Sequence, residues 1–166
     1  MEEVCQKLIP CIQGVGDMKC YVIFIDKTAI GYVQCYPVKK HPWDNLDLPE
    51  EVIQDSAGLD FFIGEKKLIG QGLGCQILDA FLKSHIWPHY RFCLADPDIC
   101  NEISMRLFRK CGFKEHQLIN SKDALQYPVS LQLFIKEREC ENLILHSFNA
   151  GEKNSISTLD FRRYRC

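Results

Sequence analysis

The sequence predicts an α/β domain, and three observations support this fold class. Apolar, strand-like runs alternate along the chain with segments whose apolar residues recur at helical spacing. A glycine-rich turn, residues 70–74, joins one of these strands to one of these helices. The chain has 166 residues, of which 46% are hydrophobic and 25% charged, so it can form a single domain with a buried core.

The front half of the chain is expected to contain a hairpin followed by a long loop. The predicted elements are a helix over residues 4–12, strands over 21–25 and 30–36, and one helical turn over 50–54. Residues 26–29 would connect the two strands. Pro42 and Pro49 mark the loop, which spans residues 41–56.

The second half alternates predicted strands and helices. The expected strands span residues 59–63, 91–95, 113–119 and 129–135, and the expected helices span 72–85 and 102–111. Pro88 would end the first helix. The second helix would bury one face, formed by Ile103, Leu107, Phe108 and Cys111.

The turn at residues 70–74 has the features of a phosphate-binding site. The helix that follows it carries its apolar residues on one face, namely Leu73, Ile77, Leu78, Phe81 and Leu82. Free backbone N–H groups at such a helix start, together with the helix dipole, bind phosphate. Gly72 and Gly74 would let a ligand approach without meeting a Cβ. A plain structural connection is the alternative, since the turn fits neither a P-loop nor a dinucleotide fingerprint.

A second segment, residues 96–113, adds weight to the binding hypothesis, because Asn101 is followed by an aromatic residue, Phe108, and by Gly112-Phe113. Together the two segments resemble the GNAT superfamily of acetyl-coenzyme A-dependent N-acetyltransferases, with its pyrophosphate loop and its Asn…Tyr-x-x-x-Gly-Phe signature. Within it the likeness is greatest to aminoglycoside 6′-N-acetyltransferases. The residues that carry this likeness are 30–36, 58–60, 70–74 and 95–97 with Asn101, and the resemblance covers residues 1–136.

The resemblance implies a GNAT fold, with a central mixed, mostly antiparallel sheet flanked by helices, and acetyl-coenzyme A as acyl donor. The residues that it implies at the cofactor are Phe62, Ile63, Gln71, Gly72, Leu73, Gly74, Cys75, Asn101 and Phe108. The implied substrate is a small cationic polyamine, an aminoglycoside. The residues that the resemblance implies for its binding are Gln34, Tyr36, Trp43, Asp60 and Asp96. The implied reaction is acetylation of the 6′-amino group by direct attack of the amine on the thioester.

The chemistry requires a carboxylate, because an ammonium group cannot attack a thioester before its nitrogen loses a proton. The resemblance assigns the acidic catalytic residue to Asp60. Asp96 would hold and orient the amine. A backbone N–H group near Phe62 would stabilise the oxyanion that forms on the acyl group.

The segment 41–60 is acidic and contains no Lys or Arg. Its carboxylates are Asp44, Asp47, Glu50, Glu51, Asp55 and Asp60. Clefts lined with one sign of charge concentrate ligands of the opposite sign, so the segment suits a polycation. A solvated acidic loop is the alternative. Trp43 offers an apolar face for a sugar ring or a cation.

The chain departs from the family in three ways. Ile69 stands where the glycine loop often begins with Gln or Arg, and Phe108 replaces a tyrosine that is a proposed proton donor. The family's first strand and first helix have no counterpart, so a sheet beginning at residue 21 would expose an edge. We expect residues 1–140 to form the domain. The tail, 141–166, is expected to be mobile from residue 151 on, or else the tail or a second copy of the chain would cover that edge.

Composition argues against several other classes of protein. A net charge of −2 is unlike that of general nucleic-acid-binding proteins, and no apolar run approaches the length of a membrane span. The ten cysteines include no C-x-x-C pair, and Pro88 separates His85 from His89, so no metal site is expected. The start of the chain does not resemble a signal peptide, which favours a cytoplasmic protein with free thiols.

Two other functions remain open at this level. One is a siderophore-type hydroxylysine N-acyltransferase, although such relatives usually carry His at the position of Asp60. The other is a non-catalytic acyl-coenzyme A-binding remnant, which the missing front segment and Phe108 favour. A homodimer is compatible with each of these functions.

Overall fold

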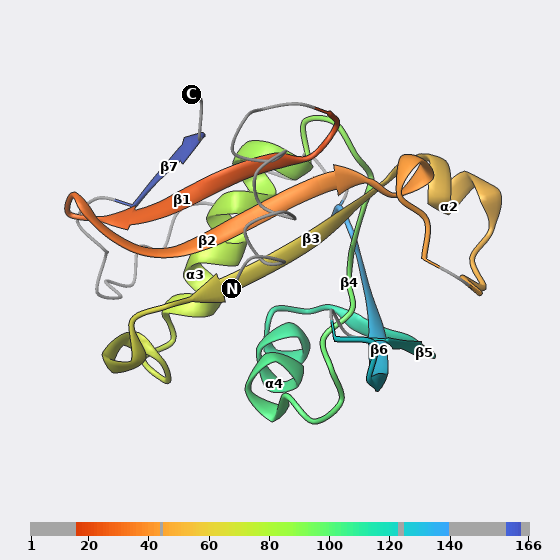
Figure 1. The fold of residues 1–166 in the computed structure, drawn as a ribbon. Coiled ribbons are helices and arrows are strands. Elements are labelled where there is room, and N and C mark those ends of the chain that lie inside the picture. The colour runs from red at the N-terminus through yellow and green to blue at the C-terminus, as the bar shows by residue number, and fades with distance from the viewer. Residues whose placement is uncertain (1–15, 44, 123–124, 140–158, 164–166) are drawn as a thin grey trace.

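The computed structural model describes residues 16–43, 45–122, 125–139 and 159–163, and the helix expected over 4–12 lies outside them. The described residues form a seven-stranded sheet with helices packed against it (Figure 1). Across the sheet the strands are β5 (Lys114–Lys122), β6 (Pro128–Glu137), β4 (Phe92–Ala95), β3 (Ser56–Ile63), β2 (Thr28–Pro37), β1 (Lys19–Ile25) and β7 (Leu159–Arg163). Every pairing is antiparallel except that of β3 with β4, which confirms the mixed, mostly antiparallel sheet.

The hairpin of β1 and β2 forms as predicted, and its turn consists of Asp26 and Lys27. Both residues have positive φ, 48° and 70°, as the two central residues of a type I′ turn require. This turn twists in the same sense as the strands and therefore sets their register. In the separate pairing of β2 with the next strand, β3, Gln34 lies opposite Asp60.

The helices lie close to their predicted positions. They are α2 (Glu50–Gln54), α3 (Leu73–Phe81), which continues as the π-helical turn η3 (Leu82–Ile86), and α4 (Glu102–Lys110), with short 3₁₀ turns η1 (Val38–Lys40) and η2 (Lys66–Leu68). Figure 1 shows α3 running behind β1, β2 and β3. Its buried residues Ile77, Leu78 and Phe81 pack in the main core, which confirms the predicted apolar face. No helix among the described residues is both long and apolar enough to cross a membrane.

The predicted buried face of α4 needs correction. Ile103, which we expected to be buried, is 57% exposed, whereas Met105 and Phe108 are buried. Successive helical residues are separated by about 100°, so Ile103 lies nearly opposite Met105. The helix therefore packs on the side of Met105 and Phe108, with Leu107 and Cys111 partly buried at its margin.

The tail contributes a strand, so its residues 159–163 do not fit the expected mobile segment. β7 pairs with β1 along the edge that we expected to be exposed. Phe161 of β7 contacts the rings of Phe81 and His85, with centroid distances of 5.2 and 5.5 Å. These contacts attach the end of the described chain to the core side of the sheet. The division between domain and tail at residue 140 stays a prediction.

The sheet opens between β3 and β4. The parallel pairing joins only Ser56 to Phe92, Ala57 to Cys93 and Gly58 to Leu94. Beyond these pairs β3 continues to Ile63, while β4 and its neighbour β6 diverge from it, as Figure 1 shows. The far half of β3 thus presents an edge that no other described strand covers.

Candidate functional site

Asp60 lies on β3 just beyond the last parallel pair, on the face of the sheet opposite to α3. Gln34 of β2 is the cross-strand neighbour of Asp60, and its amide nitrogen donates a hydrogen bond to Oδ2 of the Asp60 carboxylate. Burial raises the pKa of Asp60 above the usual range of an aspartate, and the Gln34 hydrogen bond partly opposes this rise. The structure therefore brings the predicted residues Gln34 and Asp60 together.

Tyr32 belongs to the same cluster, although no sequence motif selects it. Its hydroxyl donates to Oε1 of Gln34 over 2.6 Å, and its ring lies 5.7 Å from that of Phe62. Tyr32 and Phe62 are opposite each other in the β2–β3 register, two residues along from Gln34 and Asp60. The contact of Tyr32 with Phe62 depends on this cross-strand register, which a sequence does not fix.

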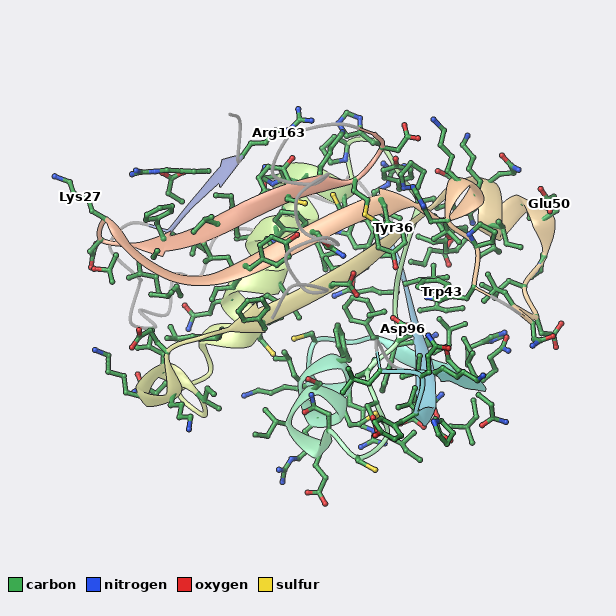
Figure 2. All side chains as sticks on the ribbon, in the orientation of Figure 1. Lys27, Tyr36, Trp43, Glu50, Asp96 and Arg163 are labelled. Carbon is green, nitrogen blue, oxygen red and sulfur yellow. The ribbon has the colours of Figure 1, made fainter. Side chains whose placement is uncertain are left out.

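Asp96 directly follows β4 and forms the other side of the opening. Burial raises its pKa to about 7, and the nearby charge of Asp60 adds to the rise. Hydrogen bonds from backbone and from the Trp43 side chain act in the opposite direction. Figure 2 shows Trp43 and Asp96 side by side, below Tyr36. The predicted residues Trp43 and Asp96 are therefore in contact.

Tyr36 is buried between the two carboxylates and the backbone of β3. Its ring lies against Gly58, where an added Cβ would come within 2.5 Å of Cε2, so only glycine fits there. Burial raises the pKa of Tyr36, and the charges of Asp60 and Asp96 raise it further. Its ring also meets that of Trp43 edge-on, at a centroid distance of 6.2 Å.

The rest of the acidic segment lies away from this cluster. Figure 2 shows Glu50 at the right-hand edge of the molecule, away from Asp96. The backbone of Asp47 is held by Gln117 and His116 of β5, and the carboxylate of Asp55 accepts from the backbone of Arg91. Asp44 is outside the described residues. Among the described carboxylates of the segment 41–60, Asp60 is the one that meets Asp96.

The glycine turn ends in the N-terminus of α3, where Gly72 is the N-cap residue. Gly70 and Gly72 have φ of +83° and +80°, which glycine adopts readily. The N–H groups of Leu73, Gly74 and Cys75 lie in the first turn of α3 and therefore have no intrahelical acceptors. No described side chain caps this helix. An added Cβ at Gly72 would meet no described atom within 4 Å, so the space beside it is open.

Gly74 has a packing role in addition to the one expected at the cofactor, which stays a prediction. A Cβ at this position would lie 2.8 Å from Cδ1 of Leu107 on α4. The glycine therefore permits close packing of α3 against α4, and the same contact surface includes a hydrogen bond between the thiols of Cys75 and Cys111. The absence of a side chain at Gly74 is explained by this packing and gives no separate evidence of a ligand.

The open edge of β3 carries backbone groups that pair with no other described strand. The N–H of Gly64 donates to the carbonyl of Ile30 on β2 over 2.8 Å. Since N–H groups alternate in direction along a strand, the N–H of Phe62 also points to β2, and those of Phe61 and Ile63 point to the open edge. The expected donor near Phe62 is thus more specifically Phe61 or Ile63. The side chain of Phe62 is 57% exposed beside this edge.

The remaining predicted residues lie in or near α4 and the glycine turn. Asn101 is the N-cap of α4, and its Oδ1 accepts from the N–H of Ser104 over 3.1 Å. Phe108 is buried against Phe113 and Phe134, so most of its ring belongs to the core. The Gln71 amide donates to the carbonyl of Lys67 within the turn. Contacts of these three residues with a cofactor stay predictions.

Other parts of the described surface contribute little to this site. A hollow of about 660 Å³, lined by residues of β5 and β6 that include Lys114 and Lys136, contains none of the predicted site residues. No group of three or more His, Cys, Asp or Glu side chains suitable for a metal ion occurs within the described ranges.

An opened mixed sheet, an uncapped helix after a glycine turn and two converging carboxylates are compatible with an enzyme that transfers an acyl group to an amine. The family model of the acetyltransferase (GNAT) domain matches residues 2–121. The chain therefore belongs to the GNAT family of N-acetyltransferases, which use acetyl-coenzyme A as acyl donor.

Solved structures share this fold. Aminoglycoside 6′-N-acetyltransferase AAC(6′)-Ib, in complex with ribostamycin and coenzyme A, aligns with a TM-score of 0.64 and 20% identity over 80% of this chain and 72% of its own. The aminoglycoside N(6′)-acetyltransferase of Legionella pneumophila aligns with a TM-score of 0.63 and 20% identity over 81% and 72%. An uncharacterised protein of Bacillus halodurans reaches 0.65 with 22% identity over 82% and 65%. No curated protein sequence matches the chain.

Proposed function

We propose that this enzyme acetylates the 6′-amino group of an aminoglycoside, with acetyl-coenzyme A as the donor. The observation that carries the proposal is the convergence of Asp60 and Asp96 beside the open edge of β3, with Tyr36 and Trp43 around them. Two carboxylates in a partly buried site favour a substrate with ammonium groups. The proposal is further supported by the fold shared with AAC(6′)-Ib, whose structures contain ribostamycin or kanamycin together with coenzyme A.

The described residues suit acetyl-coenzyme A at two places. The uncapped N-terminus of α3, entered through Gly70 and Gly72, offers N–H groups to the pyrophosphate. The open edge of β3 offers N–H and C=O groups to the amides of the pantetheine arm, in the manner of an added strand. Acetyl-coenzyme A supplies an activated acyl group, because its thioester carbonyl carbon accepts an amine nitrogen.

Asp60 is the general base of the proposed mechanism. Its carboxylate binds the substrate ammonium and then accepts the proton, directly or through a water molecule. The raised pKa of Asp60 makes it a stronger base than an exposed aspartate, and burial supplies most of that effect. The Gln34 hydrogen bond holds the carboxylate in place while the proton is transferred.

Asp96 and the aromatic residues orient the amine. A substrate ammonium beside Asp96 favours the ionised carboxylate, so binding a cation should release the proton that Asp96 carries near neutral pH. Trp43 fixes Asp96 through its hydrogen bond, and its ring offers a face to a sugar or a cation. The N–H groups of Phe61 and Ile63 suit the carbonyl oxygen on which negative charge develops.

A thiol-release assay with acetyl-coenzyme A tests this proposal. The panel should contain two aminoglycosides that differ only by an amine or a hydroxyl at the 6′ position, together with N-hydroxylysine. We expect release with the 6′-amine alone and none with Asp60→Asn. Release with hydroxylysine instead would favour a siderophore-type acyltransferase, and the absence of release with every amine would contradict the proposed substrate class.

A further inference from the structure

A chain of hydrogen bonds leads from the neighbouring strands to Asp60. The Tyr32 hydroxyl donates to Oε1 of Gln34 over 2.6 Å, and the Gln34 amide nitrogen donates to the Asp60 carboxylate. The Tyr32 oxygen also lies 3.0 Å from Sγ of Cys20 on β1. Three adjacent strands, β1, β2 and β3, thus contribute to one polar line that ends at the proposed base.

The protons that are available determine which group donates and which accepts in this chain of hydrogen bonds. The Tyr32 hydroxyl has one proton, and the amide oxygen of Gln34 is a much better acceptor than the sulfur of Cys20. With its oxygen held by Tyr32, the Gln34 amide must present its NH₂ group to Asp60. The opposite orientation would bring two acceptor oxygens together at an ionised carboxylate, which is repulsive.

We propose that Tyr32 is a positioning residue for Asp60, which it holds through the Gln34 amide in the orientation that suits proton acceptance. This inference rests on the proposed function, in which Asp60 is the base. Tyr32 itself need not touch the acyl donor or the amine for this role. Its ring is held by β2 and by contact with Phe62, so the hydroxyl has a fixed place from which to act.

The surroundings of Asp60 make its pKa a readout of this line. Burial raises the pKa of Asp60, and the Gln34 hydrogen bond lowers it. Among the described residues, the titratable groups that face Asp60 are Tyr36 on β2 and Asp96 after β4. Neither is part of the line, so loosening the Gln34 amide should raise the pKa of Asp60 while leaving these neighbours in place.

Tyr32→Phe is the matched change, since it removes the hydroxyl and keeps the ring against Phe62. Tyr90→Phe is the control, because it removes a hydroxyl from a half-buried tyrosine that packs on the core side of the sheet. The probe is the titration of ¹³C-labelled aspartate carboxyls by NMR without substrate. The signal of Asp60 is assigned by its loss in Asp60→Asn.

We expect Tyr32→Phe to raise the pKa of Asp60 by about half a unit and Tyr90→Phe to leave it unchanged. Gln34→Met, which cannot donate to the carboxylate, should raise it by more and serves as a second variant. An Asp60 pKa that is the same in the wild type, Tyr32→Phe and Gln34→Met would overturn the inference.

Kinetics separate this inference from the proposed function. For the amine substrate, kcat/KM of Tyr32→Phe should fall about tenfold, as a slightly misplaced base predicts, while KM for acetyl-coenzyme A stays the same. The acid limb of its pH profile should move to higher pH, because a carboxyl of higher pKa loses its proton only at higher pH. A wild type that acetylates no polyamine would refute the proposed function, whereas the NMR titration would still decide the role of Tyr32.

Discussion

Asp60 lies on β3 and Asp96 directly follows β4, where the two strands separate and the sheet opens; burial raises the pKa of Asp96, and the charge of Asp60 adds to the rise. Like charges at close range cannot both ionise freely, so the pair holds a proton near neutral pH. A cationic substrate removes that constraint by supplying positive charge. In the proposed function, the pair would therefore select an amine and take part in the transfer of its proton.

Replacing Asp60 should separate cofactor binding from chemistry. We expect Asp60→Asn to bind acetyl-coenzyme A with unchanged affinity in calorimetry and to lose acetyl transfer by about 10²–10⁴-fold, the usual contribution of a general base. The same change removes a neighbouring negative charge, so the pKa of Asp96 should fall below its value of about 7. A fully active Asp60→Asn enzyme would mean that another group accepts the proton.

Asp96 should make the stability of the protein depend on pH. Its pKa is about 7 in the folded chain against an ordinary 3.8, so the folded state binds the extra proton between these values. Stability should therefore fall as pH rises from about 4 to 7, and Asp96→Asn should remove a loss on the order of 4 kcal/mol over this window. Urea unfolding at pH 5 and pH 8 measures the difference. Asp79→Asn, at an exposed carboxylate of α3, is the control, and an equal pH response of wild type and Asp96→Asn would contradict the prediction.

Amine binding should release a proton in the same pH range. Because a substrate ammonium favours ionised Asp96, the affinity for an aminoglycoside should rise from pH 6 to pH 8. Calorimetry in two buffers of different ionisation enthalpy counts the released protons. Asp96→Asn should bind more weakly and show less of this pH dependence. Equal proton release by wild type and variant would assign the effect to another group.

Gly74 and Leu107 should behave as a coupled pair in stability. Gly74→Ala brings a methyl group against Leu107, at a cost of about 1–3 kcal/mol, and Leu107→Ala in the same chain should recover part of that cost. Thermal unfolding of both single variants and the double variant gives the coupling. If the two changes were additive, the close packing of α3 on α4 would not be the reason for glycine at this position.

β7 should stabilise the fold through the side chain that faces the core. Phe161→Ala removes the contacts with Phe81 and His85, so we expect a loss of about 1–3 kcal/mol in the free energy of unfolding. Arg162 faces the other side, over the ring of Phe24, and Arg162→Ala should cost less than about 1 kcal/mol. Equal small effects of the two changes would show that β7 adds little to stability.

Local sequence patterns predicted most of the fold. The hairpin, the helical turn at Glu50–Gln54 and the apolar face of α3 all follow from spacing that spans only a few residues. The tail was one candidate to cover the edge at β1, but β7 itself was not predicted as a strand, because it is short and basic, with Leu159 and Phe161 as its only large apolar residues. Its strand conformation comes from pairing with β1, a partner more than a hundred residues earlier in the chain.

The site was harder to predict where contacts depend on register or packing. Motifs led to Asp60, Asp96, Gln34 and Tyr36, which the structure brings together. Tyr32 carries no motif signal, and its contact with Gln34 follows only from the positions of their side chains on the folded strand. The role of Gly74 likewise depends on how α4 packs against α3, which helical periodicity within either helix does not reveal.

The position of the acetyl group on the product shows whether the enzyme acetylates the 6′-nitrogen, and its dependence on Asp60 shows whether Asp60 is the base. Incubation with acetyl-coenzyme A and an aminoglycoside that carries several amines, followed by mass spectrometry and NMR, identifies the modified nitrogen. We expect one acetyl group, on the 6′-nitrogen, and we expect Asp60→Asn to lose this acetylation. Acetylation at a different amine, or a product that forms equally well with Asp60→Asn, would contradict it.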